Sequence, residues 1–229
     1  MTATNPEQHA RRLAAESLAA HDVTGWFERL YSAAERGEAV VPWDRGGPHP
    51  LLQQWASARR MSDGRALVVG AGLGEDAELV AGLGLATTAF DISATAIRAA
   101  RERFPDSMVD LVVADLLDPP PAWRGAFDLV VESLTVQSLP RSARRGASDN
   151  VASFLAPGAT LVVIAAALED ADPSAGPPWP LTRAEIGAFA SGGLQEVRIE
   201  QVPSPHDRTW LWWLAEFRRP SPGPGGSSN

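Results

Sequence analysis

The sequence predicts an α/β protein built on one doubly wound, mostly parallel sheet with an antiparallel hairpin at its C-terminal end. The chain has 229 residues, 45% hydrophobic and 21% charged, which is the size and composition of one globular domain. From residue 65 onward, short β-branched apolar segments alternate with helical segments, as in repeated βα units. Near the C-terminus, two apolar segments joined by a Pro-containing loop indicate a closing hairpin.

Helical segments are expected before the sheet. Residues 1–24 are rich in Ala, Arg and Glu and are expected to be flexible or to form a short helix. A second helix is predicted over 25–36, because aromatic and aliphatic residues recur there at i, i+1, i+4 and i+5: Trp26, Phe27, Leu30 and Tyr31. After the Pro- and Gly-rich connection VVPWDRGGPHPLL, a helix is expected over 51–59.

The sheet is predicted from seven strands. The first five are short and apolar, as strands buried on both faces are: 66–69, 87–90, 111–113, 128–131 and 161–164. Helices are expected between them at 76–83, 94–103 and 142–154, with Ser93 as an N-cap and Pro157-Gly158 as a turn before the fifth strand. A helix over 183–190 then precedes the hairpin strands, 196–201 and 210–217. The tail PSPGPGGSSN, residues 220–229, is expected to be disordered.

Composition excludes several classes of function. The net charge of −8 and the pI near 5.0 argue against partners such as nucleic acid or an anionic membrane surface. All 20 basic residues counted as Lys or Arg are Arg, which removes lysine Schiff-base chemistry, and the absence of Cys removes disulfides, thiolate metal sites and cysteine nucleophiles. The sequence has no apolar run long enough for a membrane span and no signal-peptide pattern at its N-terminus, so a cytoplasmic location is expected.

The strongest motif is the glycine loop Gly70-Ala71-Gly72-Leu73-Gly74, which follows the first predicted strand and precedes a helix. Glycines at such a position allow a sharp turn and a close approach of the backbone to a ligand. A dinucleotide site requires a further glycine where this chain has Glu75, and Asp76 adds a second carboxylate at the helix N-terminus. Two acids would repel a phosphate but tolerate a sulfonium cofactor with an amino group. The alternative is that both acids only complement the helix dipole.

Two further carboxylates follow strands. Asp91 ends the second predicted strand, twenty-one residues after Gly70, where it can accept hydrogen bonds from both hydroxyls of a ribose. The alternative role for Asp91 is an N-cap, which Ser93 can also perform. Asp115 ends the third strand, where its side chain can accept from an adenine amino group while the Leu116 N–H donates to a ring nitrogen. Together these residues predict a nucleoside-containing ligand.

The runs ALVVGAGLGEDAELVAGLGLATTAFDIS, VVADLL and FDLVVES resemble class I S-adenosylmethionine-dependent methyltransferases. Within that class, the chain is similar to the thiopurine, thiol and thiocyanate methyltransferase group over about residues 26–217. The similarity rests on an apolar first-strand residue, a Gly-x-Gly-x-Gly-x-Asp loop, a Pro-Trp-Asp-x-Gly segment and a Gly-Pro-Pro-aromatic loop, here Val68, Gly70 to Asp76, Pro42 to Gly46, and Gly176 to Trp179. Two positions differ: Leu30 or Tyr31 replaces a second lid tryptophan, and Ala71 replaces a usual Cys.

The resemblance implies a Rossmann-like fold with an N-terminal helical lid. It implies one domain over 25–219, with lid helices in 25–60 and a core in 65–219. The implied cofactor is S-adenosylmethionine, and the resemblance assigns it three groups of contacts. The lid contributes Trp26 and Trp43; the grip on the cofactor comes from Gly70, Gly72, Gly74, Asp76, Asp91, Ile92, Asp115 and Leu116; and the methionine end faces Glu132 and Ser133.

The expected reaction is metal-free methyl transfer to a thiol, hydroxyl or related nucleophile of a small molecule. A thiolate needs no general base, whereas a phenol or alcohol benefits from one, for which His49 and His206 are the candidates. Tyr31 and Trp179 are candidate substrate contacts, while Trp210, Trp212 and Trp213 suit packing, and Arg141, Arg144 and Arg145 suit a solvated helix face. The alternatives are an O- or N-methyltransferase dedicated to a secondary metabolite, an NAD-dependent dehydrogenase and a non-catalytic binding protein.

Overall fold

A computed structural model describes residues 5–61, 63–167, 176–177, 179–204 and 210–221 of the chain. The strands are β1 Arg65–Val69, β2 Ala86–Asp91, β3 Asp110–Val113, β4 Phe127–Ser133, β5 Leu155–Ala166, β6 Gln195–Pro203 and β7 Leu211–Arg218. The helices are α1 Pro6–Ala19, α2 Gly25–Glu35, α3 Pro50–Ser57, α4 Glu75–Ala81, α5 Ala94–Arg103, α6 Arg141–Ser153 and α7 Arg183–Gly187. Short 3₁₀ turns form η1 Pro121–Trp123, η2 Val136–Ser138 and η3 Ala188–Ala190.

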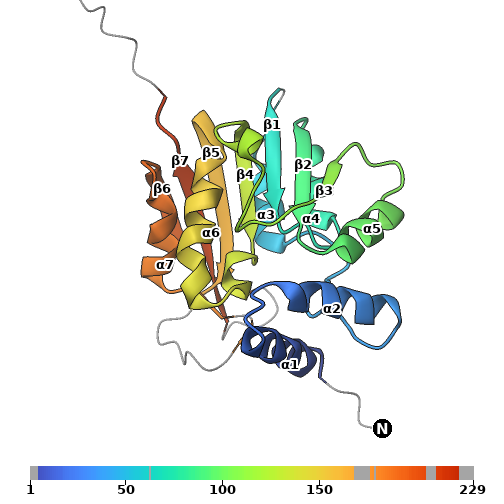
Figure 1. Ribbon diagram of the computed structural model, residues 1–229. Coiled ribbons are helices and arrows are strands. Elements are labelled where there is room, and N and C mark those ends of the chain that lie inside the picture. Colours follow the sequence, from blue (N-terminus) through green and yellow to red (C-terminus); the bar gives the residue numbers. More distant parts are fainter. Residues whose placement is uncertain (1–4, 62, 168–175, 178, 205–209, 222–229) are drawn as a thin grey trace, which may run out of the picture.

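The strands form one seven-stranded sheet in the order β3-β2-β1-β4-β5-β7-β6. Strands β1 to β5 pair in parallel, and β7 pairs antiparallel with both β5 and β6, which confirms the predicted doubly wound sheet and its closing hairpin. Each face buries its own apolar cluster: α6 and α7 cover one face, and α3, α4 and α5 cover the other (Figure 1). Strand order reverses between β1 and β4, and α/β proteins bind ligands at the carboxyl ends of strands beside such a reversal.

The fifth strand differs from its prediction. It begins at Leu155 rather than at residue 161, and the Pro157-Gly158 pair lies within it instead of forming a turn before it. The pairing of β4 with β5 is irregular there, because Phe127 pairs with Leu155 but Leu129 pairs with Thr160. Gly158 adopts a φ of +81°, and its N–H donates to the Arg219 carbonyl at 2.9 Å. The residue that follows β7 therefore continues the pairing with β5 at the irregular position.

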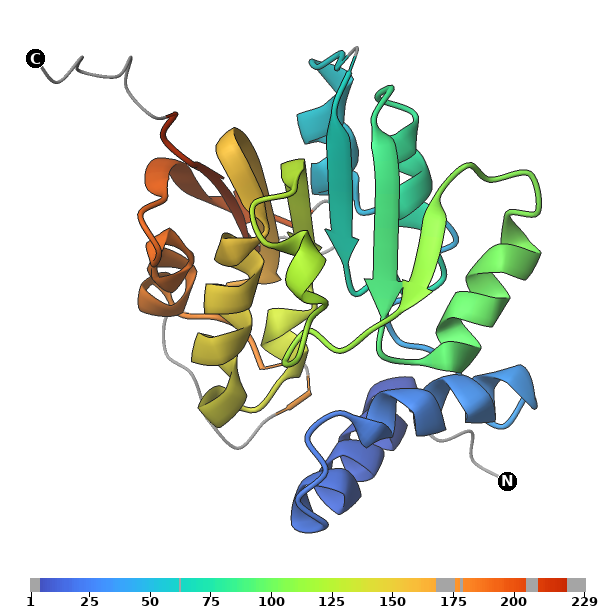
Figure 2. The ribbon, with the colours of Figure 1, turned by 45° about the horizontal axis from the view of Figure 1, so that its top comes forward.

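The two N-terminal helices lie beyond the carboxyl ends of β1 and β2, where both views show the strand arrows pointing toward α1 and α2 (Figures 1 and 2). They share a small apolar core of their own: Ala10, Leu13, Ala14, Trp26 and Leu30. Asn5 caps α1, since its side chain accepts from the Glu7 N–H at 3.0 Å. The two helices therefore form a layer that can cover a ligand bound at the strand ends.

Within the described ranges, no helix is long and apolar enough to cross a membrane.

Candidate active site

A cavity of about 320 Å³ opens at the carboxyl ends of the central strands, beneath α2 and the segment that follows it. Most of the residues predicted to bind the cofactor or the acceptor line it: Tyr31, Trp43, His49, Gly70, Gly72, Asp76, Asp91, Ile92, Asp115, Leu116 and Ser133. The tertiary structure thus brings together side chains from α2, the loop before α3 and the ends of four strands. In the described part of the chain, no group of three or more His, Asp or Glu residues could hold a metal ion.

The glycine loop has the backbone conformation that the motif predicts. Gly70, Gly72 and Gly74 have φ values of +67°, +53° and +97°, in the left-handed region that side chains with a Cβ disfavour. A Cβ on Gly70 would overlap the Thr135 side chain, so this glycine also allows β1 and the β4 end to approach. Gly74 is different, because it faces Ala100 and Phe104 of the α5 region rather than the cavity. Its role is helix packing, whereas Gly70 and Gly72 line the ligand space.

Asp91 occupies the floor of the cavity at the end of β2. Its Oδ2 accepts from the Gly72 N–H at 2.9 Å, and its Oδ1 accepts from the Ser93 N–H at 2.9 Å. Burial raises the pKa of Asp91, while the hydrogen bonds from Ser93 and Gly72 oppose that rise. Each carboxylate oxygen has a further lone pair, so the two oxygens can accept from two neighbouring hydroxyls such as those of a ribose.

Asp115 and Leu116 line the cavity beyond β3. The Asp115 Oδ1 accepts from the Leu117 N–H at 2.8 Å, which fixes the turn, and Asn150 of α6 donates to the Leu116 carbonyl at 2.9 Å. Leu116 is 7% exposed and presents apolar surface to the cavity. An anchored carboxylate beside an apolar wall suits the edge and face of an adenine ring.

Asp76, in the first turn of α4, connects three segments around the cavity. Its Oδ1 accepts from the His49 N–H at 2.7 Å, and its carboxylate is also hydrogen-bonded to Ser133 at the end of β4. Burial raises the pKa of Asp76, and these two hydrogen bonds oppose the rise. Glu75 has a different partner, since it pairs with Arg103 of α5. Asp76 therefore joins α4 to the loop before α3 and to the end of β4, whereas Glu75 joins α4 to α5.

His49 lines the cavity but does not have the properties of a general base. It is the N-cap of α3, and its Nδ1 accepts from the Leu51 N–H at 3.2 Å. Burial, with a contribution from the positive charge of Arg45, lowers the pKa of His49 to about 3. The ring is therefore neutral near pH 7, and because Nδ1 is the acceptor, Nε2 carries the proton. His49 can therefore donate a hydrogen bond from Nε2–H to a ligand in the cavity. His206, the second candidate base, lies outside the described residues.

Aromatic side chains form the roof of the cavity. The Trp43 Nε1–H donates to the Tyr31 hydroxyl at 2.8 Å, and both rings line the ligand space. Burial, followed by the charge of Asp91, raises the pKa of Tyr31, which is therefore a neutral phenol. The expectation for Trp26 differs from the structure: this residue is 1% exposed, packs inside the α1–α2 layer and does not line the cavity. Its neighbour Phe27, stacked on it at 3.9 Å between centroids, lines the cavity instead.

Two further expected contacts lie outside the cavity lining. Glu132 is completely buried, and its Oε1 accepts from the Thr135 and Val136 N–H groups, each at 2.8 Å. Its side chain therefore shapes the turn that leads to η2 rather than facing a cofactor. Burial raises the pKa of Glu132 to about 7, although the two backbone hydrogen bonds oppose that rise.

Trp179 is held away from the cavity lining by its backbone. Its N–H donates to the Gln137 carbonyl at 3.0 Å, and its carbonyl accepts from Arg144 at 2.9 Å. Arg144 is only 4% exposed and pairs with Glu185 at 2.6 Å, so it does not belong to a solvated face as expected. The sequence pattern of α6 does not reveal this contact with Trp179 and Glu185, because these two partners lie 35 and 41 residues from Arg144 in the sequence.

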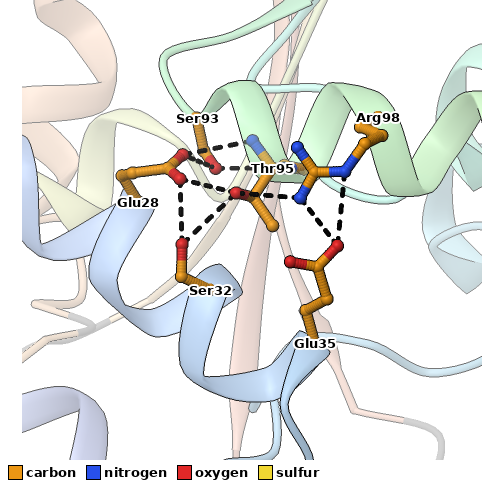
Figure 3. Close-up of polar contacts among 7 residues, drawn as sticks. Glu28, Ser32, Glu35, Ser93, Thr95 and Arg98 are labelled. Atoms are coloured by element: carbon orange, nitrogen blue, oxygen red, sulfur yellow. Dashed lines mark hydrogen bonds and ion pairs between the residues drawn. The ribbon is translucent and has the colours of Figure 1, made fainter.

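The sequence interpretation missed Glu28 of α2, which fastens the helical layer to the core (Figure 3). Its carboxylate accepts from the Ser93 hydroxyl at 2.6 Å, the Thr95 hydroxyl at 2.5 Å and the Ser32 hydroxyl at 2.9 Å. Burial alone would raise the pKa of Glu28, but these hydrogen bonds outweigh it and lower the pKa to about 2. The carboxylate also lies at the N-terminus of α5, where the helix dipole favours a negative charge.

Glu28 is connected through Ser93 to Asp91 on the floor of the cavity. Ser93, which donates to Glu28 through its hydroxyl, also donates its N–H to Asp91. Two turns further along α2, Glu35 pairs with Arg98 of α5 at 2.6 Å. The polar positions 28, 32 and 35 recur at helical spacing opposite the apolar face of α2, a signal from which a second contact face could have been predicted.

Comparisons with known proteins agree with this geometry. The model of the thiopurine S-methyltransferase family matches residues 34–210 of the chain. A probable thiol methyltransferase 2 from Arabidopsis thaliana is 25% identical over 170 residues, covering 73% of this chain and 72% of the plant protein. Thiocyanate methyltransferase 1 from Brassica oleracea is 25% identical over 169 residues, covering 72% of this chain and 74% of its own length.

A solved structure is also similar. The N-methyltransferase NodS from Bradyrhizobium japonicum WM9, in complex with S-adenosyl-L-homocysteine, has a TM-score of 0.65 and 27% sequence identity, covering 84% of this chain and 99% of that one. The family match includes the glycine loop, Asp91 and Asp115, so the compared region contains the floor of the cavity.

Proposed function

Because this chain belongs to the thiopurine S-methyltransferase family, whose model matches residues 34–210, we propose that it methylates the sulfur of a small-molecule thiol. The chain is an S-adenosylmethionine-dependent methyltransferase acting on small molecules. The observation that carries the choice of sulfur is the state of His49, the histidine that lines the cavity. Since its pKa is about 3 and its Nδ1 is already an acceptor, it cannot take a proton from an alcohol near pH 7.

The residues present fit the cofactor. S-adenosylmethionine supplies an activated methyl group, so the protein has to bind, orient and exclude water rather than activate the donor. We assign the ribose hydroxyls to Asp91 and the adenine to Asp115 and Leu116, on the basis of their fixed positions at the ends of β2 and β3. The methionine end is assigned to Gly70 and Gly72 of the glycine loop, because their backbone can approach a ligand closely.

The carboxylates in the cavity support an acceptor that ionises without help. Asp91 already accepts two backbone N–H groups, and Asp76 accepts from His49 and Ser133. These contacts hold both carboxylates in fixed positions, and we assign Asp91 to binding the ribose and Asp76 to joining three segments of the site rather than to proton transfer. A thiol with a pKa near or below 8.5 is partly a thiolate at neutral pH and needs no proton acceptor from the protein. The curated relatives named above are a thiol and a thiocyanate methyltransferase, and both acceptors react through sulfur or a related soft nucleophile.

The proposal is tested by acceptor competition at a fixed cofactor concentration, with release of S-adenosylhomocysteine as the readout. Benzenethiol, phenol and aniline form a matched set that differs only in the nucleophilic atom. We expect kcat/KM for benzenethiol to exceed that for phenol by at least about a hundredfold, since phenol needs a proton acceptor and His49, the histidine in the described lining of the cavity, cannot serve as one. With a series of thiols, the midpoint of the pH profile should follow the thiol pKa.

Two results would overturn the assignment of sulfur. One is phenol turnover comparable to thiol turnover. The other is faster methylation of aniline than of benzenethiol, which would favour the N-methyltransferase activity of the structural neighbour NodS.

A further inference from the structure

We propose that Arg45 binds a carboxylate group on the methyl acceptor, and that the acceptors of this enzyme are therefore thiols that carry a carboxylate. The inference rests on the proposed S-methyl transfer and extends it by naming the anionic class of acceptor. It is carried by three groups that meet at one end of the cavity: a cation with no ion-pair partner among the described residues, a hydrogen-bond donor and an indole ring.

Arg45 is the one arginine among the described residues that line the cavity. Its guanidinium carbon lies over the Trp212 ring, 5.7 Å from the centroid, an arrangement that orients the planar group. Within the described ranges, its guanidinium forms no ion pair or hydrogen bond. An arginine on a cavity wall without a fixed anionic partner is suited to an anion that arrives with a ligand.

The neighbouring acids have other partners. Asp44 pairs with Arg103 at 3.2 Å, and Glu75 also pairs with Arg103. Burial lowers the pKa of Arg45 and the charge of Asp76 opposes that change, but the Asp76 carboxylate accepts from the His49 N–H and from Ser133. The carboxylates beside Arg45 are therefore engaged in joining segments of the fold, and Arg45, an exposed residue in the lining of the cavity, can pair with an anion of the ligand.

His49 supplies a second donor beside the same ring. Its imidazole packs edge-on against Trp212 with 5.0 Å between centroids, and its neutral state places the proton on Nε2. A neutral donor can stand close to Arg45 without charge repulsion. Together the guanidinium and the imidazole N–H can donate to the two oxygens of one carboxylate, with the Trp212 ring as a flat apolar wall.

The sheet order places this group on the acceptor side of the site. The cofactor residues assigned above lie at the ends of β1, β2 and β3, whereas Trp212 belongs to β7, which is two strands beyond β4. Neighbouring strands are about 4.8 Å apart, so Trp212 is on the order of 10 Å from the end of β4. A carboxylate held there would orient a ligand that extends from the sheet centre toward β7.

The decisive experiment measures binding of benzoate and of benzamide to the enzyme saturated with S-adenosylhomocysteine, by calorimetry. Benzamide has the same shape as benzoate without its charge. We expect wild type to bind benzoate at least about tenfold more tightly than benzamide, and Arg45→Met to lose this preference. Arg124→Met is the matched control, because Arg124 is exposed, lies outside the cavity and loses the same charge. It should behave as wild type.

A kinetic arm uses 4-mercaptobenzoate, whose thiol and carboxylate lie at opposite ends of the ring, and benzenethiol. Wild type should prefer 4-mercaptobenzoate in kcat/KM by at least about tenfold, and Arg45→Met should remove the preference without a change in S-adenosylhomocysteine affinity. Equal binding of benzoate and benzamide by wild type would overturn the proposal. So would an Arg45→Met variant that loses cofactor affinity and keeps its benzoate preference, since Arg45 would then hold the cofactor. The binding arm involves no methyl transfer, so failure of thiol methylation alone would refute the proposed function and leave this inference standing.

Discussion

The contact of Glu28 with the N-terminus of α5 is the feature that a single conservative substitution tests best. Glu28→Gln keeps the shape of the side chain and removes its charge. The lowering of the Glu28 pKa from 4.5 to about 2 corresponds to about 3 kcal/mol in favour of the ionised, docked form. Because the carboxylate is only half-buried, solvent screening reduces the contribution to about 1–2 kcal/mol. The substitution should therefore loosen the attachment of α2 to the core without unfolding the sheet.

Hydrogen exchange provides the direct assay. A loss of about 1–2 kcal/mol should speed exchange of the α2 amides by about 5- to 30-fold, while the amides of β1 and β4 are unchanged. Glu35→Gln is the matched control on the same helix: its pair with Arg98 is 49% exposed on both sides, and such pairs contribute less than about 1 kcal/mol. Exchange of α2 that is equal in Glu28→Gln and wild type would refute the view that this carboxylate holds the helical layer in place.

The same contact has a defined pH dependence. A carboxyl whose pKa is lower in the folded state than in the unfolded chain stabilises above its ordinary pKa, and the contribution is lost as the pH falls through the folded value. For Glu28 that window runs from about 4.5 down to about 2. Fluorescence of Trp43, on the cavity side of α2, should report the acid transition in wild type, and the transition should be reduced in Glu28→Gln.

Two other substitutions test the site and the core. Asp91→Ala should weaken S-adenosylmethionine binding by at least about tenfold, because it removes hydrogen bonds worth about 1.5–3 kcal/mol. The control is Asp110→Ala, at an exposed position of β3. If calorimetry finds the same affinity in Asp91→Ala, in Asp110→Ala and in wild type, the ribose assignment is contradicted. The Glu132 carboxyl has a raised pKa, so between about pH 4.5 and about pH 7 the folded state binds more protons than the unfolded chain. The free energy of unfolding of wild type should therefore fall as the pH rises through this range, and Glu132→Gln should remove this fall. The effect is about 3 kcal/mol, so the free energies of unfolding measured with urea at pH 5 and at pH 8 should differ in wild type and nearly coincide in the variant. The same pH dependence in both proteins would show that Glu132 is not the responsible group.

Much of the fold could be predicted because each signal for it is local. Strands buried on both faces have to be apolar along their whole length, so the five parallel strands are visible as short β-branched runs. The prediction missed the start of β5, because Pro157 and Gly158 are typical of a turn. Their strand conformation depends on Arg219, which is far away in the sequence and pairs with Gly158 and Ala159.

The site was predictable to the extent that its residues lie at the carboxyl ends of strands. Asp91 and Asp115 were found in this way, and both line the cavity. Outside that pattern the prediction was mixed: Tyr31 and Trp43 line the cavity as expected, whereas Trp26 does not. Trp26 and Phe27 are adjacent and both aromatic, and only the packing of α1 against α2 decides that Trp26 is buried between the helices while Phe27 lines the cavity.

The sequence by itself therefore determined the class of fold and the residues on the floor of the cavity in this methyltransferase, because glycine conformations and strand-end carboxylates are properties of a few consecutive residues. The tertiary structure decided the chemistry of the remaining walls. Whether His49 acts as a base depends on the Leu51 N–H, the burial of the ring and the charge of Arg45, and whether Glu28 is an ordinary surface acid depends on the N-terminus of α5. Protonation states follow from the surroundings of a group in space, and residues distant in the chain supply those surroundings.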